Sequence, residues 1–446
     1  MKKFPFIILF LLLSIPVWAQ LTVSECVKEA LVNNPTLKVT ESETKIATED
    51  VHQARSSFLP SLDFSGSYRR QSIVPELDMS SIKIPIGGQE ISPFSGGAIQ
   101  LGTLDNYDFR LILSQPIFTG FRLSNRWKAA KSIATSKSED LMKNRSDLIY
   151  KVENAYANVL KAQQFLQIAQ SSKQQVQAHL KDVENFVNQG MATRDELLKV
   201  QVKLSEAELT IIQAENAIKM AKVALENLTG QKLPSDATFA PMEIYESVST
   251  EIPFSIQKAY ADRAELRSLN YAKEAGQSSI KIARGGMFPS LAAFGTLGYG
   301  KPGLDFVQKK WMDYWLVGVN AEWNLWSWGK TKSQVQQARL KANTITETEN
   351  QVRDAIELDV TQACLLLEET SKRLQLTTVM EDQAAESFRV TENSYKQGLA
   401  THTDFFDTQS ELTRAQLQKA QAEIDAALSR ANWRRAIGTN ESAYKE

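Results

Sequence analysis

The chain has 446 residues, with 51 Lys and Arg against 52 Asp and Glu, and a formal net charge of -1. This balance lacks the basic excess of a nucleic-acid-binding protein, so we expect no nucleic-acid partner. The three histidines, His52, His179 and His402, are scattered without metal-ligand spacing, and no phosphate-binding glycine loop precedes a helix. The sequence therefore predicts no enzyme, no cofactor and no metal site, and a merely solvated His402.

Residues 1–19 have the pattern of a secretory signal peptide. Two lysines precede an apolar run, and small residues stand where cleavage would follow Ala19. No later stretch reaches 18 consecutive apolar residues, so we expect an exported chain without a transmembrane helix. Cys26 is a weak candidate for lipid attachment, because polar and acidic residues precede it. We interpret it, with Cys364, as a small packing residue.

The longest helical pattern runs from Phe121 to Gln189 without a Gly or Pro. An unbroken helix of that length reaches roughly 100 Å. Gly190 can adopt the left-handed conformation that ends a helix, and Thr193 with Glu196 forms the capping box that starts the next one. This pattern predicts a long hairpin with its elbow at Gly190, Ala192 and Thr193.

The hairpin recurs at an offset of 208 residues. The second elbow is at Gly398, Ala400 and Thr401, and a second stretch without Gly or Pro covers residues 330–397. A fixed-offset repeat is stronger evidence than any single motif. We therefore divide the chain into a signal peptide, two repeats, a link and a short C-terminal tail, at residues 1–19, 20–230, 231–252, 253–438 and 439–446.

Four segments alternate apolar and polar residues with a period of two, which is typical of strands with one apolar face. They cover about residues 61–70, 107–116, 290–299 and 314–325. Two interpretations remain open: a soluble sheet with one buried face, or membrane strands whose apolar face meets lipid.

Aromatic residues near the ends of these strands favour the membrane interpretation, because such residues form belts at lipid headgroups. Four strands cannot close a barrel, and an open edge in lipid leaves backbone groups unpaired. Several copies would then share one barrel. The expected belt comprises Trp311, Tyr314, Trp315, Trp323, Trp326, Trp328, Phe118 and Phe121.

The duplicated Gln-Gly-x-Ala-Thr elbows, the Phe-Pro-Ser junctions at Pro60 and Pro289 and the long helices resemble the outer-membrane efflux proteins of the TolC family. The resemblance implies a mainly α fold with membrane β-structure: an internally duplicated, long α-helical barrel or coiled coil, continuous with a 12-stranded β-barrel shared by three protomers. It implies a homotrimer in outer-membrane lipid that extends into the periplasm. There it would serve as a passive exit duct and meet an adaptor protein and an inner-membrane transporter.

The resemblance also implies a periplasmic gate around the second elbow. Asp404, Asp407 and Tyr395 match the family's gating pattern, whereas Ala400 stands where the family has a gating arginine. Asp404 has a second interpretation, because it is the third residue after Thr401 and completes a capping box. If both aspartates face the pore, three copies place six carboxylates in the neck and favour cations.

Two other functions remain as alternatives. A periplasmic coiled-coil adaptor has one long hairpin but lacks paired, aromatic-rimmed strands. A structural spacer or adhesin lacks the exact duplication.

Overall fold

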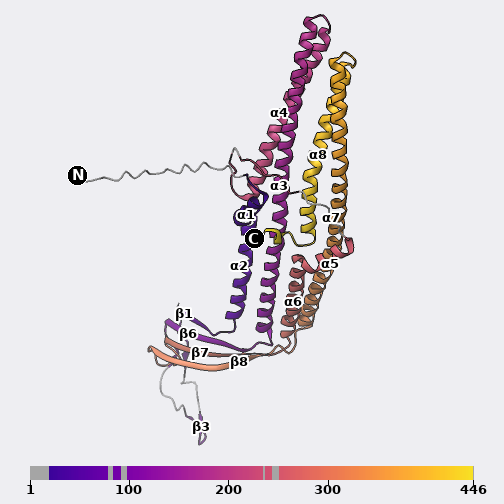
Figure 1. Ribbon diagram of the computed structural model, residues 1–446. Helices are drawn as coiled ribbons and strands as arrows, with labels where there is room; N and C mark the ends of the chain where they lie inside the picture. The colour runs from indigo at the N-terminus through magenta and orange to yellow at the C-terminus, as the bar shows by residue number, and fades with distance from the viewer. Residues whose placement is uncertain (1–19, 79–83, 92–97, 235–236, 244–250, 445–446) are drawn as a thin grey trace, which may run out of the picture. The chain divides into compact units, whose positions relative to one another are not determined.

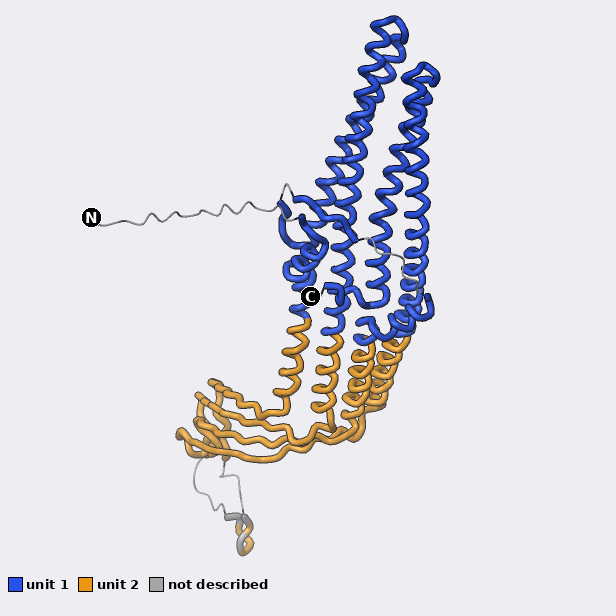
Figure 2. Tube along the Cα trace, viewed as in Figure 1, with its two compact units in different colours: residues 1–43, 138–268, 349–446 blue, residues 44–137, 269–348 orange. Residues whose placement is uncertain are grey.

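The computed structural model describes residues 20–78, 84–91, 98–234, 237–243 and 251–444, so the predicted signal peptide lies outside the described residues. The chain forms two compact units (Figure 2). The first comprises Met1–Glu43, Ser138–Ser268 and Glu349–Glu446, and the second comprises Thr44–Lys137 and Leu269–Thr348.

The same order of elements occurs twice along the chain (Figure 1). In the first repeat, two short helices, α1 (Val23–Asn33) and α2 (Pro35–Ser56), precede the strands β1 (Ser61–Arg70) and β6 (Asp105–Phe118) and the helices α3 (Arg122–Asn188) and α4 (Arg194–Thr229). The second repeat has α5 (Ile252–Asp262), α6 (Ala264–Gly285), β7 (Ser290–Lys301), β8 (Met312–Glu322), α7 (Lys330–Lys396) and α8 (His402–Ala436).

Both predicted elbows are confirmed as turns between antiparallel helices. The helices α3 and α7 each contain 67 residues, and the glycines that follow them, Gly190 and Gly398, have φ of 73° and 74°. Reciprocal capping boxes start the return helices, from Thr193 with Glu196 in α4 and from Thr401 in α8. Local sequence therefore sets the position and the geometry of each turn.

A matching junction in each repeat joins the short helices to the end of the return helix. Asn34 separates α1 from α2, and its Nδ2 donates to the carbonyl oxygen of Leu228 at 2.8 Å. Arg263 separates α5 from α6, and its Nη1 donates to the carbonyl oxygen of Ala436 at 3.3 Å. Each bond satisfies a carbonyl that a helix C-terminus otherwise leaves unpaired. The two acceptors are themselves 208 residues apart.

The four main strands form one antiparallel sheet in the order β1-β6-β7-β8, within the second unit. Three of the predicted strands agree closely with this sheet. The fourth was predicted too long, because β8 ends at Glu322, where its partner β7 begins at Ser290. The insertion after β1 adds two small two-stranded sheets, β2 (Glu76–Leu77) with β5 (Ile99–Gln100) and β3 (Ile84–Ile86) with β4 (Gln89–Ile91).

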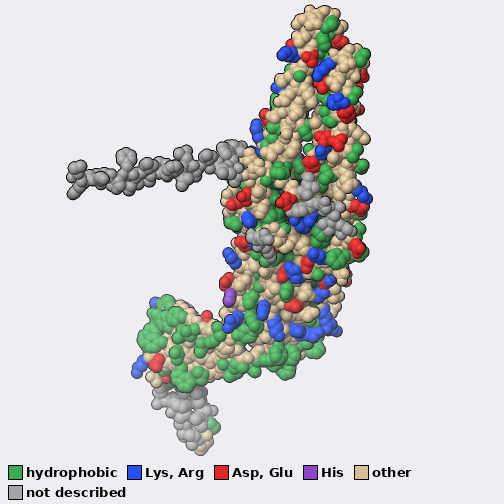
Figure 3. Space-filling model, in the orientation of Figure 1, with side chains coloured by type: hydrophobic (Ala, Val, Ile, Leu, Met, Phe, Trp, Pro, Cys, Tyr) green, Lys and Arg blue, Asp and Glu red, His purple; other side chains and the backbone are tan. Residues whose placement is uncertain are grey.

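The sheet has exposed apolar side chains. Leu62, Phe64, Val317 and Val319 are 63–72% exposed, and Figure 3 shows hydrophobic side chains gathered over the strands. Such a surface differs from that of an ordinary soluble monomer, where large apolar patches are rare. None of the described helices is both long enough and apolar enough to cross a membrane.

The largest apolar core of the described residues lies in the first unit and contains side chains of α1, α3 and α4. Tyr156 is 1% exposed there, and its hydroxyl lies 2.6 Å from the carbonyl oxygen of Leu21 and 2.7 Å from that of Ala240. Cys26 packs in the same core, and burial raises its pKa to about 12. Cys364 packs in a second core, so both cysteines act as small packing residues.

Three glycines with positive φ provide a test of these turns. Gly190 and Gly398 face open space, whereas an added Cβ at Gly230 would lie 2.9 Å from the carbonyl oxygen of Asn33. We expect Gly190→Ala and Gly398→Ala to cost about 1–2 kcal/mol each, from left-handed backbone strain alone. Gly230→Ala adds a steric clash of about 1–3 kcal/mol. Thermal unfolding in detergent measures the difference, and equal losses at Gly190 and Gly230 would contradict this account.

Candidate functional site

The predicted gate residues lie around the second elbow, in the first unit. The carboxylate of Asp404 accepts hydrogen bonds from the backbone N and Oγ1 of Thr401, at 2.9 and 2.6 Å. The hydrogen bond from the Thr401 side chain has the larger effect and the one from its backbone the smaller, and together they hold the pKa of Asp404 below its ordinary value. Asp404 is thus a capping-box acid, as its second interpretation expected, and it remains exposed.

Asp407 is also exposed and lies one helical turn after Asp404, outside the cap. The two carboxylates therefore lie on the same side of α8. In the first repeat, the equivalent positions carry Glu196 and Lys199, so only the second elbow has two acids in this arrangement.

His402 is not simply solvated, and that prediction is wrong. Its Nδ1 lies 2.9 Å from Nε2 of His179 on α3, although 223 residues separate the two in sequence. His179 is 3% exposed, and its ring stacks on Phe405 with centroids 4.1 Å apart. Tyr395, the predicted gating tyrosine, packs in the same cluster, with its ring centroid 4.9 Å from that of His179 and 5.7 Å from that of Phe405.

Burial makes this histidine pair prefer its neutral form. It lowers the pKa of His179 to about 4, and it also lowers the pKa of His402 despite the opposing charge of Glu196. Within the described part of the chain, Nε2 of His402 is buried without a hydrogen-bond partner, so a proton there would be costly. The neutral pair therefore joins the α3–α4 hairpin to the α7–α8 hairpin.

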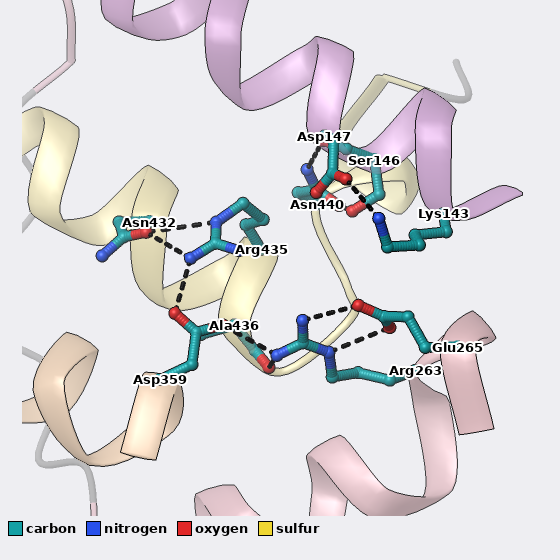
Figure 4. Close-up of polar contacts among 10 residues, drawn as sticks. All are labelled: Lys143, Ser146, Asp147, Arg263, Glu265, Asp359, Asn432, Arg435, Ala436 and Asn440. Atoms are coloured by element: carbon teal, nitrogen blue, oxygen red, sulfur yellow. Dashed lines mark hydrogen bonds and ion pairs between the residues drawn. The ribbon is translucent and has the colours of Figure 1, made fainter. Parts of the chain in front are cut away.

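A second polar cluster surrounds Arg263 at the junction of α5 and α6 (Figure 4). Its guanidinium contacts Glu265 and Asp359 at 2.8 Å each, and Arg435 contacts the other oxygen of Asp359 at 2.7 Å. Burial alone would raise the pKa of Asp359, but hydrogen bonds from both arginines outweigh it and lower the pKa. The cluster connects α6, α7 and α8 through one buried guanidinium.

The short C-terminal tail also packs in the first unit. Asn440 exchanges two hydrogen bonds of 2.7 Å with Ser146 on α3 (Figure 4). Tyr444, in the 3-10 turn Glu441–Tyr444, donates to the buried carboxylate of Glu153 at 2.7 Å. Burial raises the pKa of Glu153, against the effects of Tyr444 and Arg434. The tail therefore binds the middle of α3 through Asn440 and Tyr444.

The predicted belt aromatics occur near both ends of the sheet, in the second unit. At the loop end, Trp311 stacks on Tyr299 with centroids 5.0 Å apart, and Tyr314 and Trp315 lie early in β8. At the helix end, Phe118 is the last residue of β6, and its ring centroid lies 5.3 Å from that of Phe121. Trp323, Trp326 and Trp328 follow β8. The ring centroids of Trp326 and Trp328 lie 5.7 Å apart, and Trp323 donates to the carbonyl oxygen of Met287.

The fold defines a class of protein in which each of two repeats contributes one long helical hairpin and two strands of a single antiparallel sheet. A model of the outer membrane efflux protein family matches residues 26–231 and 255–439. The chain belongs to this family, whose members are transport channels, and it is an outer-membrane protein.

Curated relatives and solved structures agree with this assignment. The outer membrane protein TolC of Vibrio cholerae is 23% identical, over 96% of this chain and 92% of its own. The alkaline protease secretion protein AprF of Pseudomonas aeruginosa is 23% identical, over 72% and 67% of the two chains. The structure of CusC superposes with a TM-score of 0.77 at 18% identity, over 93% and 92% of the two chains, and that of the channel OprN with 0.76 at 16%, over 93% and 89%.

The histidine pair predicts a pH-dependent contact between the hairpins. Because burial lowers the pKa of His179 from 6.5 to about 4, the separated state binds protons more readily than the packed one. The stabilising effect of neutral packing is therefore complete above about pH 6.5 and is lost as the pH falls toward 4. Spin labels at Met191→Cys and Leu399→Cys, both exposed, should report a larger separation at pH 4 than at pH 7.5.

The matched control for this experiment is the exposed His52. His52→Gln should retain the pH response, whereas the double variant His179→Gln, His402→Gln should lose it. Other groups near the pair are Glu196 and Lys199 on α4, Asp182 on α3 and Tyr395 on α7. A response that survives in the double variant would assign the effect to these groups instead.

Proposed function

We propose that this protein is a trimeric outer-membrane channel-tunnel and the passive exit duct of a tripartite efflux or secretion system. The observation that carries the proposal is the combination of two 67-residue helices with a sheet whose apolar side chains are exposed. A periplasmic adaptor or a structural spacer has no use for such a sheet. The relatives include efflux and secretion proteins, which supports a duct in either kind of system.

The sheet supports a barrel shared between copies. Among the residues that the structure describes, its edge strands, β1 and β8, each pair on one side only. In lipid, the unpaired backbone groups of an open edge are expensive, so β1 of one copy would pair with β8 of the next. Three copies of this four-stranded sheet make a closed barrel of twelve strands.

The surface of α4 supports the same assembly. One seam of this helix, with Val200, Ala214 and Leu225, is fully buried within the chain. A second seam has apolar side chains that are about half exposed, and their separations of 4, 7, 3 and 11 residues are sums of the three- and four-residue steps of a coiled coil. The second seam consists of Leu198, Val202, Leu209, Ile212 and Val223, which are 49–56% exposed. A helix with two apolar seams fits between two neighbours, the second of which would come from another copy.

The elbows supply a surface for a periplasmic adaptor. Met191 and Leu399 occupy equivalent positions at the two tips and are 64% and 78% exposed. They lie beside the predicted docking residues Gly190, Ala192, Thr193, Gly398, Ala400 and Thr401. An apolar tip surrounded by polar residues is typical of a protein interface. Through the adaptor the duct would receive cargo from an inner-membrane transporter, which supplies the energy.

The assembly can be tested with the seam on α4. The wild type should require detergent, run as a trimer and conduct ions in a planar bilayer. The double variant Leu209→Glu, Ile212→Glu places charge on the exposed seam and should shift the protein toward monomers. Glu208→Gln, Glu215→Gln, at neighbouring exposed positions of α4, is the control and should remain trimeric. A water-soluble, non-conducting monomer would overturn the proposal.

Selectivity tests the gate. Asp407 is exposed near the second elbow, and three copies would place a ring of carboxylates in the neck of the duct. Asp407→Asn should lower the preference for cations, or the block by divalent ions, in single-channel recordings. Asp404→Asn also weakens a helix cap, so Asp407→Asn is the cleaner variant. Unchanged permeability ratios would remove Asp407 from the pore.

A further inference from the structure

Exposed cations are concentrated where the helices of the second unit adjoin the sheet. The ten side chains, which we call the basic patch, belong to the first turns of α3, the last turns of α6 and the first turns of α7. They are Arg122, Arg126, Lys128, Lys131, Lys281, Arg284, Lys330, Lys332, Arg339 and Lys341, and all are exposed. No Asp or Glu occurs within residues 109–138, 275–304 or 323–346, which contain them.

These ten cations differ from a set of exposed lysines on the hairpins that pair with carboxylates. Within the described residues, none of the ten forms an ion pair with a carboxylate, whereas exposed lysines on the hairpins do. Lys199 pairs with Asp195 at 2.6 Å, and Lys203 pairs with Glu206 at 2.8 Å. The unbalanced charge is therefore local, because the whole chain is nearly neutral.

The position of the patch also opposes the usual preference of helices. The N-terminus of a helix carries partial positive charge and favours acidic residues. The helices α4 and α8 follow this rule with Asp195, Glu196 and Asp404, but the first turns of α3 and α7 contain no acid. The first turns of α3 and α7 carry cations in place of acids, an arrangement that a nearby anion would stabilise.

The patch directly follows exposed aromatic residues. Phe121 precedes Arg122 and is 60% exposed, and Trp328 precedes Lys330 by two residues and is 89% exposed. Figure 3 shows Lys and Arg side chains beside the hydrophobic surface of the same unit. Aromatic side chains followed by cations match the order of acyl chain, glycerol and phosphate in a lipid leaflet.

A groove within the second unit combines the same two properties. It has a volume of about 740 Å³ and lies among α3, α6 and α7. Arg122 and Lys341 line it together with the apolar side chains of Ile133, Ile282 and Ile345. A cation beside an apolar wall suits an anionic amphiphile better than a free inorganic anion.

We propose that the basic patch binds the anionic phosphate headgroups of phospholipids in the periplasmic leaflet of the outer membrane. This inference rests on the proposed insertion of the sheet into that membrane. The lipid would neutralise cations that have no protein counter-charge, and it would set the depth at which the helices leave the bilayer.

The experiment compares two quadruple variants of the full chain in detergent. Arg126→Gln, Lys128→Gln, Lys330→Gln and Lys332→Gln together remove four charges of the patch. Lys199→Gln, Lys203→Gln, Lys372→Gln and Lys396→Gln remove four exposed cations that have carboxylate partners, and thus serve as the matched control. Native mass spectrometry with phosphatidylglycerol and phosphatidylcholine measures the lipid retained by each protein.

We expect the wild type and the control to bind phosphatidylglycerol roughly tenfold more tightly than phosphatidylcholine, and the patch variant to lose most of this preference. Equal affinities for the two lipids, or equal losses in both variants, would overturn the inference. So would binding of soluble peptidoglycan fragments in place of the lipid. Conductance in pure phosphatidylcholine separates the two proposals: a conducting wild type without lipid preference retains the duct and rejects the lipid site.

Discussion

Helix ends impose the constraint on which this fold depends. Each return helix stops beside the break between two short helices, and its last carbonyl groups need donors. Asn34 supplies a neutral amide in the first repeat, and Arg263 supplies a guanidinium in the second. A buried guanidinium needs counter-charges, which explains why Asp359 and Glu265 surround it. The two repeats therefore satisfy the same unpaired helix carbonyl with different side chains, an amide in one and a guanidinium in the other.

The two hairpins share their backbone design and differ in their side chains. Both elbows use a left-handed glycine and a threonine capping box. Only the second elbow, however, contacts the other hairpin through His402, whose repeat equivalent is Arg194. Duplication therefore preserved the local signals that form a turn, while the contacts between hairpins diverged.

The surface of the hairpins differs from that of the sheet, as expected if the hairpins are in water and the sheet is in lipid. Lysines on the hairpins mostly pair with nearby carboxylates, as in water. On the sheet, apolar side chains are exposed, and the adjoining helix ends carry cations without ion-pair partners in the described chain. Both features are unfavourable in water, and a bilayer would stabilise both: its acyl chains would cover the apolar side chains, and its phosphates would neutralise the cations.

The sequence by itself determined the elements and the turns, because these depend on neighbours a few residues apart. Gly190 and Gly398 end helices wherever the chain is placed, and Thr193 and Thr401 start new ones. The end of β8 depends on where β7 begins, so alternation alone extended that strand beyond Glu322. Only the tertiary structure brought His179 to His402 and Arg263 to Asp359. The two members of each pair come from separate parts of the chain, and no local periodicity records which elements pack together or in what register.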